Sequence, residues 1–180
     1  IVAVNVTSVV TTTGFALGDY TTWGSFAVLL FFYLTFVGGC SGSTSGGLKI
    51  FRFQVAYVLL KANLQQLIHP RAVIKQQYNN HNLDEDIVRS LITFSFFFAI
   101  TIALIALGIT LTGVDWVTAL TGAATAVCNV GPGLGPVIGP AGNFSTLPDA
   151  AKWLLTIGML LGRLEILTVL VLFTRVFWKH

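Results

Sequence analysis

The sequence predicts an all-α integral membrane protein, in which long membrane-crossing helices alternate with short helices followed by re-entrant loops. Three observations predict it: the composition, the long runs without charge and the glycine-rich interruptions between them. Of the 180 residues, 54% are hydrophobic and 9% are charged, and the mean hydropathy is +0.81. A soluble domain carries about 25% charged residues. The composition therefore excludes an ordinary soluble enzyme, a disordered chain and a nucleic-acid-binding protein.

Runs without charge locate the long helices. No Asp, Glu, Lys or Arg occurs in residues 20–48, 90–114 or 116–148. Because a membrane crossing takes about 20 predominantly apolar residues, we expect one helix over 87–112 and another over 151–178. A third helix, 21–68, is broken by a glycine- and serine-rich loop at 38–49. Such irregular backbone persists in a bilayer only where it is packed inside protein or lines a polar cavity.

Two apolar segments, 1–10 and 116–127, are too short to cross a membrane, since twelve helical residues rise only about 18 Å. Each segment runs into a loop rich in glycine and small polar residues. The first loop is Thr11, Thr12, Thr13, Gly14 and Phe15, and the second is Cys128, Asn129, Val130, Gly131 and Pro132. We expect two half-helices that dip into the membrane and return on the same side.

The two loops form an internal repeat. At an offset of 117 positions, residues 14–18 align with residues 131–135, and glycine, leucine and glycine are identical. Each loop follows a short apolar helix and precedes a long one. Taken alone, either loop would also fit a plain turn between helices. Duplicated units in membrane proteins usually meet at a shared interface, so we expect the two loops to lie together.

The loops have the chemistry of a cation path. Backbone carbonyls in an extended loop can replace the hydration shell of a cation, and glycine permits the backbone angles that turn successive carbonyls the same way. The preceding half-helices direct the negative ends of their dipoles at the loops. Threonine hydroxyls add oxygens in the first loop, and neither loop contains Arg or Lys.

The distribution of basic residues sets the orientation. Between the glycine-rich break of the third helix and the next span lie Lys49, Arg52, Lys61, Arg71 and Lys75. The segments on the opposite side carry three aspartates and a single lysine. The positive-inside rule therefore places the connector 69–86 and the C-terminus in the cytoplasm. The connector is then either a plain topological signal or a docking surface.

In these features the chain resembles the Trk/Ktr/HKT superfamily of potassium transporters, and most closely its TrkH members. The resemblance implies potassium-channel-like repeats of helix, pore helix, filter loop and helix, four in each protein. Residues 1–68 then correspond to the end of the third repeat, with pore helix 1–10 and filter 11–15. Residues 87–180 correspond to the fourth repeat, with pore helix 116–127 and filter 128–133.

The resemblance also implies the partners. Two filters cannot encircle an ion, so we expect the remaining two repeats, the N-terminal half, to come from elsewhere in a longer chain or from another chain. The family implies a homodimer spanning the bacterial inner membrane several times. It also implies a TrkA-like cytoplasmic regulatory subunit that binds nucleotide, with potassium as the transported ion and no cofactor in this chain. Whether transport is channel-like or a symport with protons or sodium stays open.

The loop within the broken helix resembles the intramembrane gating loop of that family. Its residues are Gly38, Gly39, Cys40, Ser41, Gly42, Ser43, Thr44, Ser45, Gly46, Gly47 and Lys49. Arg163 lies near mid-membrane, where a charge costs on the order of 3 kcal/mol, so it must face polar atoms. We predict that Arg163 faces this loop and that the two form the closed gate. The alternative is a structural bridge between Arg163 and Glu165 or another carboxylate, although residues two apart point to different helix faces.

Other function classes find less support. Residues 42–49 do not fit the phosphate-loop pattern G-x-x-x-x-G-K-[ST], and no catalytic triad or carboxylate pair stands out. Three scattered histidines, His69, His81 and His180, do not predict a metal site, and Cys40 and Cys128 give no disulfide framework. The chain is therefore not expected to be an enzyme. The rivals to a potassium path are a broken-helix carrier for an organic substrate and a non-conducting membrane scaffold.

Overall fold

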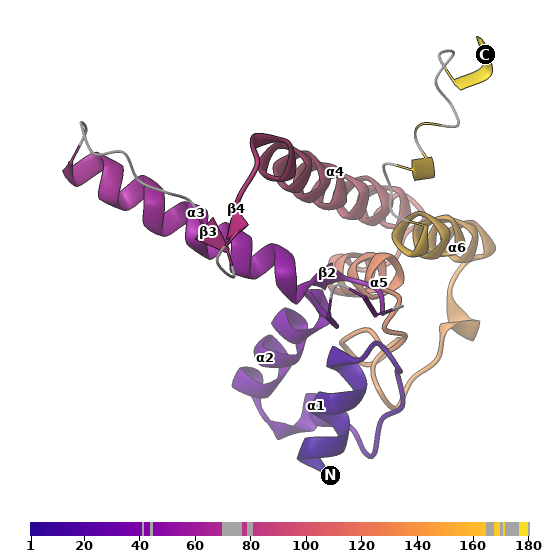
Figure 1. The fold of residues 1–180 in the computed structure, drawn as a ribbon. Helices are drawn as coiled ribbons and strands as arrows, with labels where there is room; N and C mark the ends of the chain where they lie inside the picture. Colours follow the sequence, from indigo (N-terminus) through magenta and orange to yellow (C-terminus); the bar gives the residue numbers. More distant parts are fainter. Residues whose placement is uncertain are drawn as a thin grey trace.

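The computed structural model describes residues 1–40, 42–43, 45–69, 77–78, 81–164, 168–169, 171 and 177–179. These residues are mostly helical, as predicted (Figure 1). The elements in chain order are α1 (Val2–Val10), η1 (Tyr20–Trp23), α2 (Ser25–Phe36), β1 (Val37–Gly38), β2 (Leu48–Lys49), α3 (Ile50–Ile68), β3 (Gln77–Tyr78), β4 (His81–Asn82), α4 (Glu85–Thr110), α5 (Trp116–Cys128), η2 (Phe144–Thr146), α6 (Asp149–Arg163) and η3 (Phe177–Lys179).

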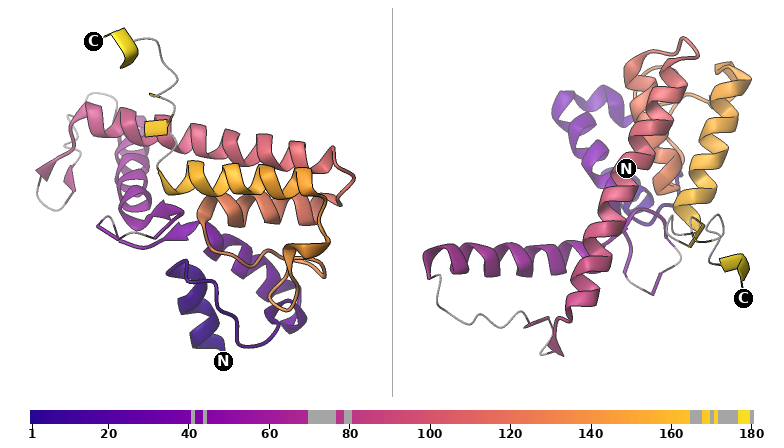
Figure 2. Two further views of the ribbon diagram at one scale, coloured as in Figure 1. Left: turned by 90° about the vertical axis from the view of Figure 1, so that its right-hand side faces the viewer. Right: turned by 90° about the horizontal axis from the view of Figure 1, so that it is seen from above.

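Helices α4, α5 and α6 pack side by side and form the core of the molecule (Figure 2). In the described part of the chain, α4 alone combines the length and the apolar composition that a membrane crossing needs. Helix α5 is short, yet nearly every residue after Val117 is buried. Small residues allow this, because alanine and glycine let neighbouring helix backbones approach closely. The short helix is thus enclosed by protein.

Glycines set the contacts of α6 with its neighbours. A Cβ added at Gly158 would lie 2.8 Å from Ile105 of α4 and 3.5 Å from Val127 of α5. A Cβ at Gly162 would lie 1.8 Å from the carbonyl oxygen of Val127. These glycines bring the last two turns of α6 directly against the end of α5.

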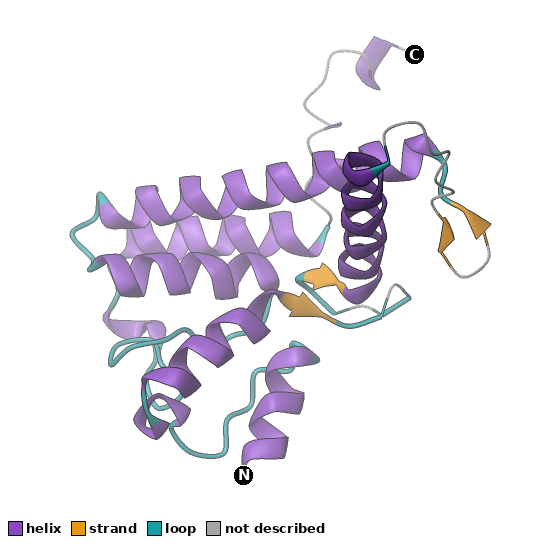
Figure 3. Cartoon of the chain, turned by 90° about the vertical axis from the view of Figure 1, so that its left-hand side faces the viewer, coloured by secondary structure: helices purple, strands orange, loops and turns teal. Residues whose placement is uncertain are grey.

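The predicted helix 21–68 is divided more sharply than expected. Gly24, at φ +105°, separates the turn η1 from α2, so the helix begins at Ser25 rather than at 21. Strands β1 and β2 then pair in parallel, Val37 with Leu48 and Gly38 with Lys49 (Figure 3). This pair closes the base of the loop 39–47, and α3 continues beyond it, away from the core. Two-residue strands have no periodicity that a sequence could reveal.

The predicted helix 151–178 is observed as α6 from Asp149 to Arg163, and residues 168, 169 and 171 are again helical. Helix α6 ends at Arg163, and Leu164 adopts φ −87° and ψ 9°. Two glycines in its last two turns lower the helix propensity there. Residues 177–179 form a 3₁₀ turn, and most of 165–176 falls outside the described residues. The predicted helix 87–112 is observed as α4, which starts at Glu85 because Glu85 and Asp86 favour the positive end of a helix dipole.

The connector 69–86 holds a short hairpin. Strands β3 and β4 pair antiparallel, Gln77 with Asn82 and Tyr78 with His81. The Tyr78 hydroxyl donates a hydrogen bond to Gln54 Oε1 at 2.6 Å, which ties the hairpin to α3. Arg71 and Lys75, which contributed to the predicted orientation, lie outside the described residues.

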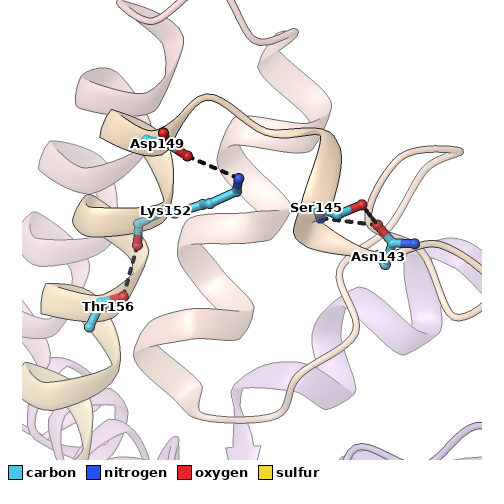
Figure 4. A network of polar contacts seen from close by, with 5 residues as sticks. All are labelled: Asn143, Ser145, Asp149, Lys152 and Thr156. Atoms are coloured by element: carbon cyan, nitrogen blue, oxygen red, sulfur yellow. Dashed lines mark hydrogen bonds and ion pairs between the residues drawn. The ribbon is translucent and has the colours of Figure 1, made fainter.

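A local polar network marks the start of α6 (Figure 4). Lys152 Nζ lies 3.1 Å from Asp149 Oδ1, and the Thr156 hydroxyl donates to the Lys152 carbonyl at 2.9 Å. In the preceding turn η2, the Asn143 side chain accepts from the Ser145 amide at 3.0 Å. Exposed ion pairs of this kind contribute little to stability. Lys152 therefore serves as a control position for substitutions at the other end of α6.

Asp115 caps α5. Its Oδ2 accepts a hydrogen bond from the Thr118 amide at 3.0 Å, which satisfies one of the amides that a helix start leaves without an intrahelical partner. Hydrogen bonds from Thr118, first from its side chain and then from its amide, lower the pKa of the Asp115 carboxyl below its ordinary 3.8. The charged form is thus the one that the folded chain stabilises.

We expect Asp115→Ala to lower the free energy of unfolding by about 1 kcal/mol. Because the folded-state pKa is depressed, the stabilisation by the wild-type carboxylate is complete above pH 3.8 and is lost as the pH falls through the folded value. Thermal unfolding of the purified protein between neutral pH and pH 3 measures both effects. Asp115→Asn keeps a capping oxygen without titrating, so it should unfold like wild type at neutral pH and lose this acid dependence. Equal losses in both variants at neutral pH would contradict the cap.

Candidate functional site

The two loops that follow α1 and α5 take the same backbone path. The non-glycine residues with positive φ in the described part of the chain are Thr12 at 55° and Asn129 at 56°, which are 117 positions apart. Gly18 and Gly135 match in the same way, at 87° and 92°. The positive φ of Thr12 is uncommon for a β-branched residue, so the fold holds this geometry against a local cost. The repeat predicted from the sequence is confirmed.

Hydrogen bonds repeat at the same offset. The Thr12 amide donates to the Val9 carbonyl at 3.1 Å, and the Asn129 amide donates to the Ala126 carbonyl at 3.0 Å. One residue further, the amides of Thr13 and Val130 each donate to a carbonyl five residues back, at 2.9 and 3.0 Å. Each short helix therefore ends in the same hydrogen-bonded turn.

The two loops meet backbone to backbone. A Cβ added at Gly14 would lie 2.3 Å from the carbonyl oxygen of Val130 and 3.5 Å from Pro132 Cδ. A Cβ at Gly131 would lie 3.7 Å from the Cα of Gly14. Glycine is required at position 14, because any side chain would separate the loops. The two loops therefore lie together, as the internal repeat predicted.

One buried polar side chain anchors the returning part of each loop. Asn5 of α1 is fully buried, donates to the Leu17 carbonyl at 3.3 Å and accepts from the Leu17 amide at 2.7 Å. In the second unit, the Thr121 hydroxyl accepts from the Leu134 amide at 3.2 Å and lies 3.3 Å from its carbonyl oxygen. Leu17 and Leu134 are equivalent positions of the repeat. Sequence reasoning missed both anchors, although Asn5 stands out as an amide inside an apolar helix.

The units differ at one polar position. The Thr125 hydroxyl accepts from the Gly131 amide at 3.0 Å. At the equivalent Ser8, the hydroxyl is buried with no hydrogen-bond partner among the described residues. The Gly14 amide instead donates to the Ser8 carbonyl at 3.4 Å. The amides of Gly14 and Gly131 are thus held by different groups.

The glycine- and serine-rich loop contacts both the loop after α1 and the loop after α5. The Gly46 amide donates to the Thr12 hydroxyl at 3.2 Å. A Cβ at Gly46 would lie 2.1 Å from the Cys128 carbonyl oxygen and 3.0 Å from Asn129 Cβ. Inside the loop, the Ser45 hydroxyl accepts from the Gly39 amide at 2.8 Å. Ser41 and Thr44, also predicted as part of this loop, lie outside the described residues.

Arg163 and this loop line one cavity of about 200 Å³, together with Lys49 and Arg52. The end of α6 is fixed beside the second dip, because Asn129 Nδ2 donates to the Met159 carbonyl at 3.1 Å. The structure thus brings Arg163 to the loop that it was predicted to face. Glu165, the alternative partner, lies outside the described residues.

The remaining predicted site residues are placed without a direct role in this meeting point. The Thr11 hydroxyl donates to the Thr7 carbonyl at 2.7 Å and lies 2.8 Å from the Thr13 hydroxyl. The Phe15 side chain is 78% exposed, and Cys40 is exposed while Cys128 is buried, both as free thiols. The first loop therefore offers backbone oxygens rather than three free hydroxyls.

The helical bundle thus combines one helix of membrane-crossing length with two duplicated short helices whose following loops touch. The family model described as TrkH, cation transport protein, matches residues 3–179. The chain belongs to the TrkH family of cation transport proteins. The family resemblance predicted from the sequence is confirmed.

Individual relatives support the same family assignment. The Trk system potassium uptake protein TrkI of Halomonas elongata is 66% identical over 179 residues, covering 99% of this chain and 36% of that protein. TrkH of Escherichia coli (strain K12) is 39% identical over 175 residues, covering 97% and 36%. The crystal structure of the potassium transporter TrkH from Vibrio parahaemolyticus superposes with a TM-score of 0.86 at 36% identity, over 95% of this chain and 36% of that one. The chain spans about a third of the length of these proteins.

Proposed function

We propose that this chain supplies two of the filter loops of a potassium-uptake protein, and that potassium passes where the loops after α1 and α5 meet. One observation carries the proposal: two loops of equal geometry touch backbone to backbone at Gly14 and Val130. Relatives that are named potassium uptake proteins supply the identity of the ion.

The chemistry of the proposed path is dehydration by carbonyl oxygens. Backbone oxygens of residues 11–15 and 128–132 replace the water shell of the ion. Helices α1 and α5 end at these loops, so the negative ends of their dipoles face the ion. Asn5 and Thr121 keep the loops in place from behind. The remaining two repeats complete the ring around the ion.

The proposed gate is the loop 38–49 with Arg163. Contacts of Gly46 with both dips support a blocking position directly beside the path. Arg163 lines the same cavity as the loop, and its positive charge repels a permeating cation. Movement of the loop away from Thr12 and Asn129 opens the path.

The surroundings follow from the family. We infer a multi-pass protein of the bacterial inner membrane that functions as a homodimer. A TrkA-like nucleotide-binding subunit on the cytoplasmic side, near α3 and the connector, drives the gate. The relatives' names describe them as parts of a Trk system, which supports a multicomponent assembly.

Uptake of rubidium, a heavier congener of potassium, by the complete transporter in liposomes tests the proposal. We expect potassium to compete with rubidium, and amino acids and sugars not to compete. Crystals soaked in rubidium should show an anomalous peak between Thr12 and Asn129. Competition by an organic solute would favour a carrier, and absence of flux from an intact protein would favour a scaffold.

A further inference from the structure

The cavity beneath the loops differs chemically from the proposed ion path, because basic and hydroxyl-bearing side chains line it. It lies between the loop 39–47, the first turn of α3 and the end of α6. Three cationic side chains line it, those of Lys49, Arg52 and Arg163, and none of the described residues around it is acidic. The hydroxyl-bearing Ser43 and Ser45 line the same space. The cavity thus combines positive charge with hydrogen-bond donors.

The fold concentrates this positive charge. Lys49 caps α3 without a side-chain hydrogen bond to it, and Arg52 lies in its first turn. Cations are normally disfavoured at a helix N-terminus, because the helix dipole is positive there. The Arg52 guanidinium carbon lies 3.3 Å from the centre of the Phe94 ring of α4, which fixes its position. Dipole and side chains therefore act together to attract an anion.

A neighbouring cavity of about 410 Å³ shares Lys49 and Arg52 and opens between α3 and α4. Phe51, Ile87 and Leu91 line much of it, with Ser90 and Asp86 at the start of α4. A cationic cavity beside one that adds the apolar Phe51, Ile87 and Leu91 matches a phosphate group that carries an apolar substituent. Arginine is suited to phosphate because its planar donors bind two oxygens at once.

We propose that Lys49, Arg52 and Arg163, with Ser43 and Ser45, bind a phosphate group, supplied either by an anionic phospholipid or by free phosphate. A bound phosphate bridges the loop, α3 and α6, because these three elements provide its ligands. Occupancy then holds Arg163 beside the loop and favours the closed path. This regulatory consequence rests on the proposed function, whereas the binding itself does not.

Binding to the complete transporter is measured for Arg52→Gln, with Lys61→Gln on the exposed side of the same helix as the matched control. Equilibrium dialysis with radiolabelled inorganic phosphate tests the free source. Native mass spectrometry from phosphatidylglycerol and from phosphatidylcholine nanodiscs tests the lipid source. We expect Arg52→Gln to weaken binding from one of these sources about tenfold, Arg52→Lys to weaken it less, and Lys61→Gln to leave it unchanged.

Rubidium flux separates the two claims. If the site closes the path, wild-type flux should be lower in phosphatidylglycerol than in phosphatidylcholine liposomes, or lower with added phosphate, and Arg52→Gln should abolish that difference. The inference is overturned if a folded Arg52→Gln protein binds both probes as tightly as wild type does. It is also overturned if the wild-type protein binds chloride saturably but does not bind phosphate. Normal flux with no phosphate binding overturns the site and leaves the proposed function intact. Absence of flux in wild type, with binding preserved, overturns the proposed function alone.

Discussion

Rubidium uptake by a Gly14→Ala variant of the complete transporter is expected to fall roughly tenfold or more, because a filter tolerates little displacement of its oxygens. The added Cβ would lie 2.3 Å from the carbonyl oxygen of Val130, so one loop must move away from the other. The positive φ of 83° adds strain for any residue with a side chain. Flux into liposomes and the ratio of rubidium to sodium uptake measure the effect.

Gly18→Ala is the matched control for this variant. Gly18 has nearly the same φ, 87°, but a Cβ there would have no atom within 4 Å. It therefore carries the backbone strain without the collision, and we expect it to retain most of its uptake. Equal losses in both variants would show that backbone strain, rather than contact between the two loops, limits transport.

Replacing the arginine of the proposed gate is expected to change the rubidium flux in the opposite direction. We expect Arg163→Ala to raise rubidium flux about tenfold, because the variant removes both the repulsion of a cation and one wall of the cavity beneath the loop. Lys152→Ala on the same helix is the control, since Lys152 pairs with Asp149 at the other end of α6. Flux through liposomes at fixed potential is the measurement.

One result for Arg163→Ala would contradict the proposed gate. An Arg163→Ala protein that stays folded, by size exclusion and thermal unfolding, with flux unchanged or reduced, would assign Arg163 a structural role. A rise in flux in Lys152→Ala as well would point to a general loosening of α6.

Much of the fold could be predicted because its signals are local. Charge-free runs gave α4 and α5 to within two residues at either end, and the spacing of Gly14 and Gly131 gave the repeat. Those signals depend on composition and on neighbouring residues alone. The contact between the two repeated loops also followed, since duplicated units share an interface.

The contacts that fix the site could not be predicted, because their partners are distant in the chain. Gly46 bonds to Thr12, 34 positions away, and Asn129 bonds to Met159, 30 positions away. The parallel pairing of Val37 with Leu48 has no periodic signal in two residues. Nor does the sequence show where α6 ends, because both sides of Arg163 are apolar.

The two units anchor their loops with different side chains, and this affects how a chimera of the two units should be designed. Asn5 and Thr121 hold the equivalent leucines with different functional groups and from positions that the repeat does not match. A chimera that transplants a loop without its short helix would lose the buried side chain that anchors the loop. A chimera that exchanges the short helix together with its loop would keep the anchoring side chain.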